Sequence, residues 1–403
     1  MPDFNTDLSE RLEALRSRGL RRELRRVDSP PGTRIQIGGR TLLNFSSNDY
    51  LGLANEPLLK EAAVRAVEQF GAGSGAARLV CGSLAPHHEL EETLAAFKGT
   101  AAALSFATGY ATAIGTITAV AGRNDIIIID KLVHACIVDA ARLSGAKIRV
   151  FDHNDLDDLE QKLKWADRIQ SPKPKVQSEG RILIVTESVF SMDGDAAPLR
   201  EIIALKEKHG AWLMVDEAHA TGLYGENRRG LAEEAGVGDR IEIQMGTLGK
   251  AIGAAGGYIC GSRVLIDYLI NRARSFIFST APVPAAAAAA AAGIRFIQSK
   301  AGADRRQQLF QRIEACTSHS AFRVPHFKSA ILPVLIGDES SAVAAATALR
   351  EAGIFVPAIR YPTVARGRAR LRVTVTAAHT PADVSELTAA LEQLKTWNPK
   401  LEG

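Results

Sequence analysis

The sequence predicts an α/β protein with a large and mostly parallel sheet. Its 403 residues are 46% hydrophobic and 23% charged, which is the balance of a globular protein with an extensive core. From about residue 46 to residue 284, short runs of β-branched residues alternate with helical patterns, as in consecutive βα units. The clearest of these strands are expected at 126–129, 182–186 and 212–215.

These patterns divide the chain into three parts. Residues 1–45 hold an N-terminal helix and a hairpin, residues 46–284 form the large domain, and residues 285–403 form a smaller C-terminal α+β domain. The C-terminal part is expected to contain strands at 331–336 and 370–376 and helices at 341–352 and 381–397.

The N-terminal segment is predicted to be one amphipathic helix from Asp7 to Arg26. Leucines recur near helical spacing, and seven arginines occupy other positions of the segment. The usual meaning is a solvated helix that packs its leucines on the body of the protein. In the functional alternative, an arginine such as Arg22 reaches an acidic substrate. The glycines at 38–39 then indicate a hairpin.

Two further segments have an unusual composition. Eight consecutive alanines at 285–292 predict a tightly packed helix, because alanine has the highest helix propensity and a small side chain. The run 44–52 breaks regular periodicity with many hydrogen-bonding side chains. It is therefore expected to be a loop and a candidate part of a site.

Charge and cysteine usage exclude several classes of protein. A net charge of +4 over this length does not indicate a nucleic-acid partner, although it is compatible with an anionic substrate. The four cysteines lack CxxC spacing, so neither a zinc site nor a disulfide framework is predicted, and a reducing cytoplasm fits. The N-terminus has no apolar signal region and no stretch is long enough to cross a bilayer. We therefore expect a cytoplasmic protein without a membrane partner.

The most informative residues follow two predicted strands. Asp216 and His219 come after the strand at 212–215, and Lys250 follows the next hydrophobic run. Pyridoxal phosphate forms a Schiff base with a lysine and uses an acidic partner on its ring nitrogen, so this order predicts a pyridoxal phosphate enzyme. Asp216 would keep the ring nitrogen protonated, His219 would bind the ring oxygen, and Lys250 would act as nucleophile and proton carrier. Taken singly, each is more often a solvated charge or a capping group.

Two other positions support this interpretation. His134 lies in a strand-to-helix loop after the strand at 126–129, where parallel sheets place ligands, and a flat imidazole there can stack on a pyridine ring. Gly109 and Tyr110 have the composition of a strand-to-helix turn, and the amides at a helix N-terminus bind phosphate.

The sequence does not match the motifs of other ligand-binding sites. The glycine-rich run 71–75 follows a helical pattern instead of a strand, which excludes a dinucleotide fingerprint. Residues 216–219 resemble the acidic box of helicase-type ATPases, but the Gly249-Lys250 pair lacks the other residues of a Walker A loop. His87-His88 has no HExxH context and His134 has no companion PCxxC, so no metal site is predicted.

Together these residues resemble the α-oxoamine synthases of pyridoxal phosphate fold type I, and within them the branch that acts in biotin biosynthesis. The resemblance covers nearly the whole chain. It implies a large domain with a mostly parallel seven-stranded sheet, a smaller C-terminal α+β domain and a short N-terminal segment. The segments that carry it are 44–53, 70–82, 130–141, 153–155, 186–195, 215–222, 247–257, 276–280 and 357–379.

The resemblance implies a role for each matching cofactor position. Lys250 matches the lysine that binds the cofactor aldehyde, Asp216 matches the partner of the ring nitrogen, and His134 matches the stacking histidine. His219 and Ser191 match the neighbours of the ring oxygen. The positions that match residues near the phosphate are Gly109, Tyr110, Thr247 and Thr280.

The resemblance also implies substrate contacts and a partner. Thr280 matches a residue that reaches the phosphate from the other subunit, which implies a homodimer. Arg372 matches the arginine that clamps the carboxylate of an amino acid, a task suited to a bidentate guanidinium. Further substrate contacts are implied for Asn48, Arg22, Thr363 and His134.

The implied reaction is the decarboxylative condensation of L-alanine with a pimeloyl thioester, carried on coenzyme A or on acyl-carrier protein. Its products are 8-amino-7-oxononanoate, carbon dioxide and the free thiol carrier. The nearest alternative joins glycine and acetyl-CoA to give 2-amino-3-oxobutyrate, as a glycine C-acetyltransferase, and a non-catalytic binding module with this fold is the alternative of another class. The sequence departs from the family pattern at Val133, Cys136, Ala76, Ala77 and Tyr361. None of these changes removes a group from the implied chemistry, and those at Ala76, Ala77 and Tyr361 concern acyl-chain preference.

Overall fold

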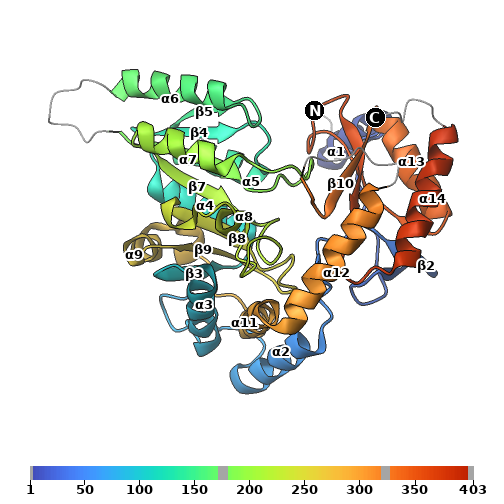
Figure 1. Ribbon diagram of the computed structural model, residues 1–403, viewed down its shortest axis with the longest axis horizontal. Helices are drawn as coiled ribbons and strands as arrows, with labels where there is room; N and C mark the ends of the chain where they lie inside the picture. The colour runs from blue at the N-terminus through green and yellow to red at the C-terminus, as the bar shows by residue number, and fades with distance from the viewer. Residues whose placement is uncertain (1–2, 171–179, 319–326, 398–403) are drawn as a thin grey trace. The chain divides into compact units, whose positions relative to one another are not determined.

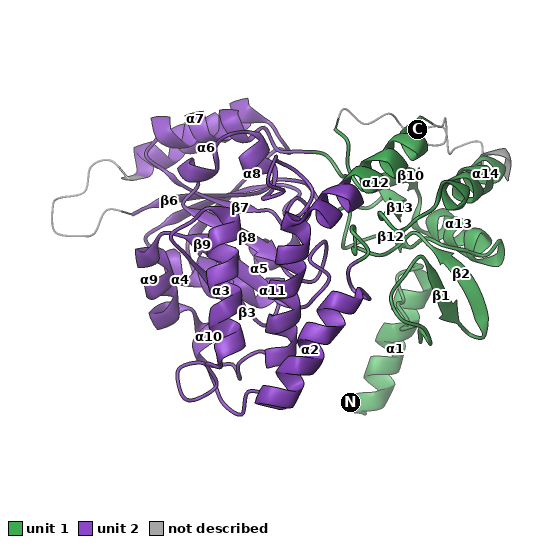
Figure 2. Ribbon diagram, turned by 60° about the horizontal axis from the view of Figure 1, so that its bottom comes forward, with its two compact units in different colours: residues 1–52, 192–195, 307–403 green, residues 53–191, 196–306 purple. Residues whose placement is uncertain are grey.

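The computed structural model forms two compact units (Figures 1 and 2). It describes residues 3–170, 180–318 and 327–397. Unit 1 joins the two ends of the chain, and unit 2 holds most of the residues between them. Unit 1 comprises 1–52, 192–195 and 307–403, and unit 2 comprises 53–191 and 196–306. The three-part division stays a prediction, because compact units are defined by contacts and not by independent folding.

Unit 2 is built on a seven-stranded sheet in the order β3-β9-β8-β7-β6-β4-β5. Strand β9 runs antiparallel to both of its neighbours, and the other pairings of this sheet are parallel. The prediction of an α/β fold with a mostly parallel seven-stranded sheet is confirmed. The strands are β3 (Ala102–Phe106), β4 (Ile126–Asp130), β5 (Lys147–Phe151), β6 (Ile182–Glu187), β7 (Trp212–Asp216), β8 (Ile243–Thr247) and β9 (Gly257–Gly261).

Helices cover both faces of this sheet. Ile127 and Ile129 of β4 belong to an apolar cluster formed with α4, α5, α9 and α10, while Ile126 and Ile128 are equally buried on the opposite face. A strand buried on both faces is apolar along its whole length instead of alternating. The helices of unit 2 that contact strands are α3 (Ala85–Lys98), α4 (Gly109–Val120), α5 (Ala135–Ser144), α6 (Leu156–Gln170), α7 (Leu199–Lys208), α9 (Arg263–Arg272) and α10 (Arg274–Ile277).

The alanine run forms the tightly packed helix that its composition predicts. It lies in α11 (Pro284–Gln298), which packs against α2 (Pro57–Phe70) and α3. The alanines at 287, 290, 291 and 292 are buried, and their small side chains let the helices approach closely. Short helical segments complete unit 2 at α8 (Leu231–Glu234) and η1 (Gly238–Arg240).

The N-terminal helix is shorter than predicted. Helix α1 (Phe4–Ser17) ends at Ser17, so residues 18–26 are not helical, and its leucines are exposed instead of packed. Gly19 has a φ of +64° and donates its N–H to the Arg16 carbonyl, while the Leu20 N–H bonds to the Leu15 carbonyl. This is the Schellman pattern, in which a left-handed glycine ends a helix.

Two three-stranded sheets make up the core of unit 1. In the first, β2 pairs antiparallel with β1 through the predicted hairpin at 38–39 and pairs parallel with β11. In the second, β13 lies between β10 and β12. The elements are β1 (Arg34–Ile37), β2 (Arg40–Asn44), β10 (Ile331–Gly337), α13 (Glu339–Glu351), β11 (Ile354–Phe355), β12 (Ala358–Ile359), β13 (Ala369–Thr374) and α14 (Pro381–Trp397). Helix α12 (Lys300–Thr317) begins in unit 2 and ends in unit 1.

In the described ranges, none of the helices is both long enough and apolar enough to cross a membrane.

Candidate active site

Three neighbouring parallel strands of unit 2 end in polar residues. Strand β6 ends in Glu187, β7 ends in Asp216 and β8 ends in Thr247. Glu187 and Asp216 lie opposite each other in the register, and both are buried. Because the carboxyl ends of parallel strands lie along one edge of a sheet, ligand sites form there.

The structure brings three of the predicted residues together at this edge. The Nζ atom of Lys250 lies 2.7 Å from Nε2 of His219, which is itself buried. Burial raises the pKa of Asp216, and the nearby positive charge of Lys250 opposes that rise. The amine, the imidazole and the carboxylate therefore belong to one electrostatic group.

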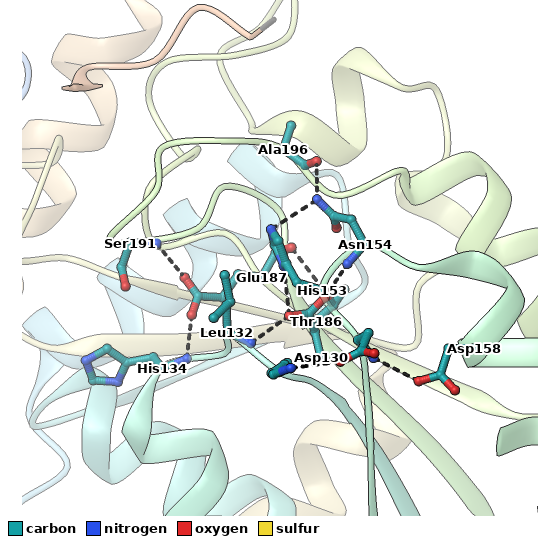
Figure 3. A network of polar contacts seen from close by, with 12 residues as sticks. Asp130, Leu132, His134, His153, Asn154, Asp158, Thr186, Glu187, Ser191 and Ala196 are labelled. Atoms are coloured by element: carbon teal, nitrogen blue, oxygen red, sulfur yellow. Dashed lines mark hydrogen bonds and ion pairs between the residues drawn. The ribbon is translucent and has the colours of Figure 1, made fainter. Parts of the chain in front are cut away.

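Glu187 belongs to this group, although the sequence analysis gave it no role. Figure 3 shows its carboxylate between His134 and Ser191, where it accepts the N–H of His134 at 2.5 Å and that of Ser191 at 3.2 Å. Burial, followed by the negative charge of Asp216, raises the pKa of Glu187 to about 8. The available signal was an acidic residue at the end of an apolar run, which is the same signal that indicated Asp216.

His134 begins helix α5. Its Nδ1 atom accepts the Cys136 N–H at 3.2 Å and lies 3.0 Å from the Cys136 thiol sulfur. His134 is exposed as a residue, but protein atoms crowd its imidazole, and this loss of hydration lowers its pKa. A neutral, flat ring held at a strand-to-helix loop fits the predicted stacking role.

The start of helix α4 lies beside Thr247, and we call these two segments together the cradle. Thr108 caps the helix by accepting the Ala111 N–H at 3.0 Å, and in the described part of the chain the N–H groups of Gly109 and Tyr110 form no hydrogen bond. A Cβ atom on Gly109 would lie 3.8 Å from Oγ1 of Thr247, so the two segments are adjacent. A Cβ atom on Gly257 would lie 2.8 Å from Cα of Gly109, so only glycine permits this approach.

Tyr110 and Thr280 have other contacts. The Tyr110 hydroxyl donates to Asp139 at 2.8 Å, which links the start of α4 to α5. Thr280 is exposed and pairs with Ala77 across an isolated bridge, and its carbonyl accepts the Ser279 hydroxyl. The contacts of Thr280 within the described residues therefore do not include Lys250.

Four of the five predicted substrate residues lie in unit 1, where Arg372 and Asn48 are in contact, and the fifth, His134, lies in unit 2. The buried Arg372 donates from Nη1 to Oδ1 of Asn48 at 3.0 Å and to Oγ1 of Thr374 at 2.9 Å. Arg22 donates to the Tyr361 carbonyl at 3.2 Å, and Thr363 donates its N–H to the Arg360 carbonyl at 3.0 Å.

A closed ion pair is formed by Glu217, the residue that follows Asp216 at the end of β7. Lys98 donates to Oε2 of Glu217 at 2.5 Å and to the Arg229 carbonyl at 2.5 Å. The other carboxylate oxygen of Glu217 accepts the Ala232 N–H at 2.8 Å. The side chains of Lys98 and Glu217 are 1% and 0% exposed, so this pair is a structural feature of the core.

The residues at this edge fit pyridoxal phosphate. Lys250 offers a primary amine to an aldehyde, the buried Asp216 offers a carboxylate to a ring nitrogen, and the helix start beside Thr247 offers amides to a phosphate. Gly257 is required beside the cradle, because a side chain there would clash with Gly109 at the helix start.

Comparisons with known proteins agree with this geometry. The model of the family "Aminotransferase class I and II" matches residues 40–391. The 8-amino-7-oxononanoate synthase of Geotalea daltonii is 49% identical over 95% of this chain and 96% of its own length. A serine palmitoyltransferase from S. paucimobilis, solved with bound PLP and myriocin, has a TM-score of 0.89 at 29% identity, covering 98% of this chain and 99% of its own. The 8-amino-7-oxononanoate synthase of Francisella tularensis has a TM-score of 0.72 at 27% identity, covering 88% and 98%. The chain therefore belongs to the class I and II aminotransferase family, of pyridoxal phosphate fold type I, and within it to the 8-amino-7-oxononanoate synthases, which are acyltransferases of biotin biosynthesis.

Proposed function

We propose that this enzyme condenses L-alanine with a pimeloyl thioester, on coenzyme A or acyl-carrier protein, to give 8-amino-7-oxononanoate, carbon dioxide and the free thiol. The observation that carries the proposal is the contact of 2.7 Å between Lys250 Nζ and His219 Nε2 beside the buried Asp216. When bound, pyridoxal phosphate supplies an aldehyde that captures an amine and a ring that stores the electrons of a carbanion.

Each residue of the Lys250 group has a defined task in this proposal. Asp216 holds the proton on the ring nitrogen, because its carboxylate is buried and close to positive charge. His219 and Ser191 position the ring oxygen, and His134 stacks on the ring. Lys250 first holds the cofactor and then takes the α-proton of alanine on its Nζ atom.

Glu187 acts on this group as a positioning residue. It fixes the backbone of both His134 and Ser191, so it sets where the stacking ring and the hydroxyl lie. With a pKa near 8 it keeps a proton at neutral pH, which limits the negative charge beside Asp216.

The phosphate and the substrate carboxylate have separate binding groups. The amides of Gly109 and Tyr110 bind the phosphate beside Thr247, using the positive end of helix α4. Arg372 binds the carboxylate of alanine, with Asn48 and Thr374 orienting its guanidinium through Nη1. Arg22 and Thr363 contact the acyl substrate.

The active unit is a homodimer in this proposal, with Thr280 serving the phosphate of the partner. Large apolar side chains are exposed on the two segments joined by the bridge between Ala77 and Thr280. Val80 is 77% exposed and Phe278 is 71% exposed. Exposed apolar clusters of this kind are covered by partners, and a second copy would cover them while bringing Thr280 to a phosphate. Light scattering should show a dimer that Phe278→Asp weakens, and a monomeric active wild type would contradict it.

Two experiments test the proposal. The holoenzyme should absorb visible light, and borohydride should fix the cofactor on Lys250, as read by peptide mass. Alanine or glycine is then paired with pimeloyl-CoA, pimeloyl-acyl-carrier protein or acetyl-CoA while thiol release is followed. We expect alanine with a pimeloyl donor to be fastest. Preference for glycine and acetyl-CoA would instead support the alternative of 2-amino-3-oxobutyrate formation.

A further inference from the structure

Unit 1 carries a concentration of arginines around two cavities, and of the arginines lining them the proposed reaction uses only Arg22. One cavity of about 930 Å³ is lined mainly by the segment 16–25 and Arg360, and a second of about 490 Å³ shares Arg25 with it. We call the arginines that line these two cavities the arginine surface. They are Arg16, Arg21, Arg22, Arg25, Arg26, Arg40, Arg350 and Arg360.

The arginine surface has a large excess of positive charge. Two carboxylates line the same cavities, and they pair with Arg21 at 3.4 Å and with Arg26 at 2.5 Å. Eight arginines against two carboxylates leave six positive charges. Burial, followed by the charges of Arg22 and Arg25, lowers the pKa of Arg360, so these guanidinium groups repel one another. An anionic partner would relieve that repulsion.

The backbone of this region is fixed even though its side chains are exposed. Arg360 donates to the carbonyls of Gly19 and Arg21, and Arg22 donates to the carbonyl of Tyr361. The segment after α1 is therefore attached to the turn after β12. Because Arg22 lies in the same cavity, a partner on the arginine surface would lie beside a predicted substrate contact.

Apolar side chains among the arginines favour a protein partner over a nucleotide. Leu24 is fully exposed and Val27 is 47% exposed within the same segment. Protein interfaces combine arginine with apolar anchors, whereas the phosphates of a nucleotide need only the cations. The two adjoining cavities also cover a wider area than one cluster of phosphate groups would occupy.

We propose that the arginine surface is the docking site of an acidic acyl-carrier protein that delivers the pimeloyl group. This inference rests on the proposed function, because it names the carrier of that thioester. Complementary charge speeds the encounter of two proteins and fixes their orientation, and its effect falls as salt is added.

The test compares two donors on matched variants. Arg16→Glu/Arg25→Glu reverses two exposed arginines, and Lys147→Glu/Arg168→Glu makes the same change in net charge on unit 2. At low salt, we expect the first variant to raise KM for pimeloyl-acyl-carrier protein by roughly 10-fold, with KM for pimeloyl-CoA unchanged within roughly 2-fold. The control should change neither KM, and 0.5 M salt should reduce the difference. Leu24→Ser should raise KM only for pimeloyl-acyl-carrier protein.

The alternative outcomes identify what fails. An equal rise in KM for both donors would assign the surface to nucleotide phosphates, and no rise for either would remove its role in docking. If wild type turns over neither donor with alanine, the proposed reaction is wrong. In that case, docking is measured directly by fluorescence anisotropy of labelled acyl-carrier protein. Equal binding by wild type and Arg16→Glu/Arg25→Glu would overturn the inference.

Discussion

Asp216 and Glu217 are consecutive buried carboxylates, yet each lies near a lysine in a different environment. Glu217 faces Lys98 in a closed arrangement in which the amine donates to a carboxylate and a carbonyl, and both carboxylate oxygens are bonded. Asp216 faces Lys250 at the sheet edge, where the lysine is half-buried and its amine meets the His219 imidazole.

The difference separates a structural lysine, Lys98, from Lys250, for which we propose a chemical role. In the closed pair each charge offsets the desolvation of the other, so removal of one partner is costly and neither group is available to a ligand. In the open group, formed by Lys250, His219 and Asp216, the amine has a titratable neighbour and lies at the sheet edge where α/β proteins bind ligands. Burial of a lysine near an acid therefore does not by itself indicate catalysis.

Removal of the open lysine should have the largest effect. Lys250→Ala is expected to lower turnover by at least about 1,000-fold, because the variant lacks the amine that we propose holds the cofactor and moves the proton. Circular dichroism should show an unchanged fold. A rate within tenfold of wild type would refute the assigned role.

Removal of the closed lysine should act on stability instead. Lys98→Ala leaves the Glu217 carboxylate buried without its cation, and should lower the free energy of unfolding by about 3–5 kcal/mol in a denaturant titration. Lys98→Met/Glu217→Leu removes both charges and should recover much of the loss. If Lys98→Ala unfolds within about 1 kcal/mol of wild type, the pair is not structural in this sense.

Glu187 gives the open group a distinct dependence on pH. Its pKa rises on folding from 4.5 to about 8, so the folded state holds a proton that the unfolded state has lost. The stabilisation is present below pH 4.5 and is lost as pH rises towards and through 8. In Glu187→Gln, the free energy of unfolding should fall less than in wild type as pH rises from 4.5 to about 8. An identical slope in the variant and in wild type would show that Glu187 does not bind this proton.

The smallest effect is expected for substitution of Tyr258, a buried residue of β9. Its hydroxyl lies 2.8 Å from Oγ1 of Thr221 in the core. Tyr258→Phe removes this hydrogen bond and should cost about 1 kcal/mol of unfolding free energy. Turnover with saturating substrates should stay within twofold. A large loss of turnover would place Tyr258 in the open group.

The proximity of the residues in the open group was predictable, because each one ends or follows a strand that is recognisable from the local sequence. Asp216 and His219 follow one apolar run and Lys250 follows the next, so the ends of parallel strands bring them to one edge. Glu187 obeys the same rule, but its bond to His134 spans 53 positions and needs the strand order.

Other features depend on distant contacts or on a local signal that outweighed the pattern. The bond between Lys98 and Glu217 spans 119 positions, and nothing near either residue indicates the other. The end of helix α1 is different, since the left-handed Gly19 is a local stop signal that outweighs the leucine periodicity continuing beyond it.

The pairing of β2 with β11 has a consequence for synthesis on the ribosome. Leu43 pairs with Ile354, a separation of 311 positions (354 minus 43), while all seven strands of the large sheet lie between residues 102 and 261. The large sheet can therefore form while the first segment of unit 1 still waits for its neighbour to be translated. A premature stop before Ile354 would deprive β2 of its partner β11, so a loss at the end of the message would be felt near the beginning of the protein.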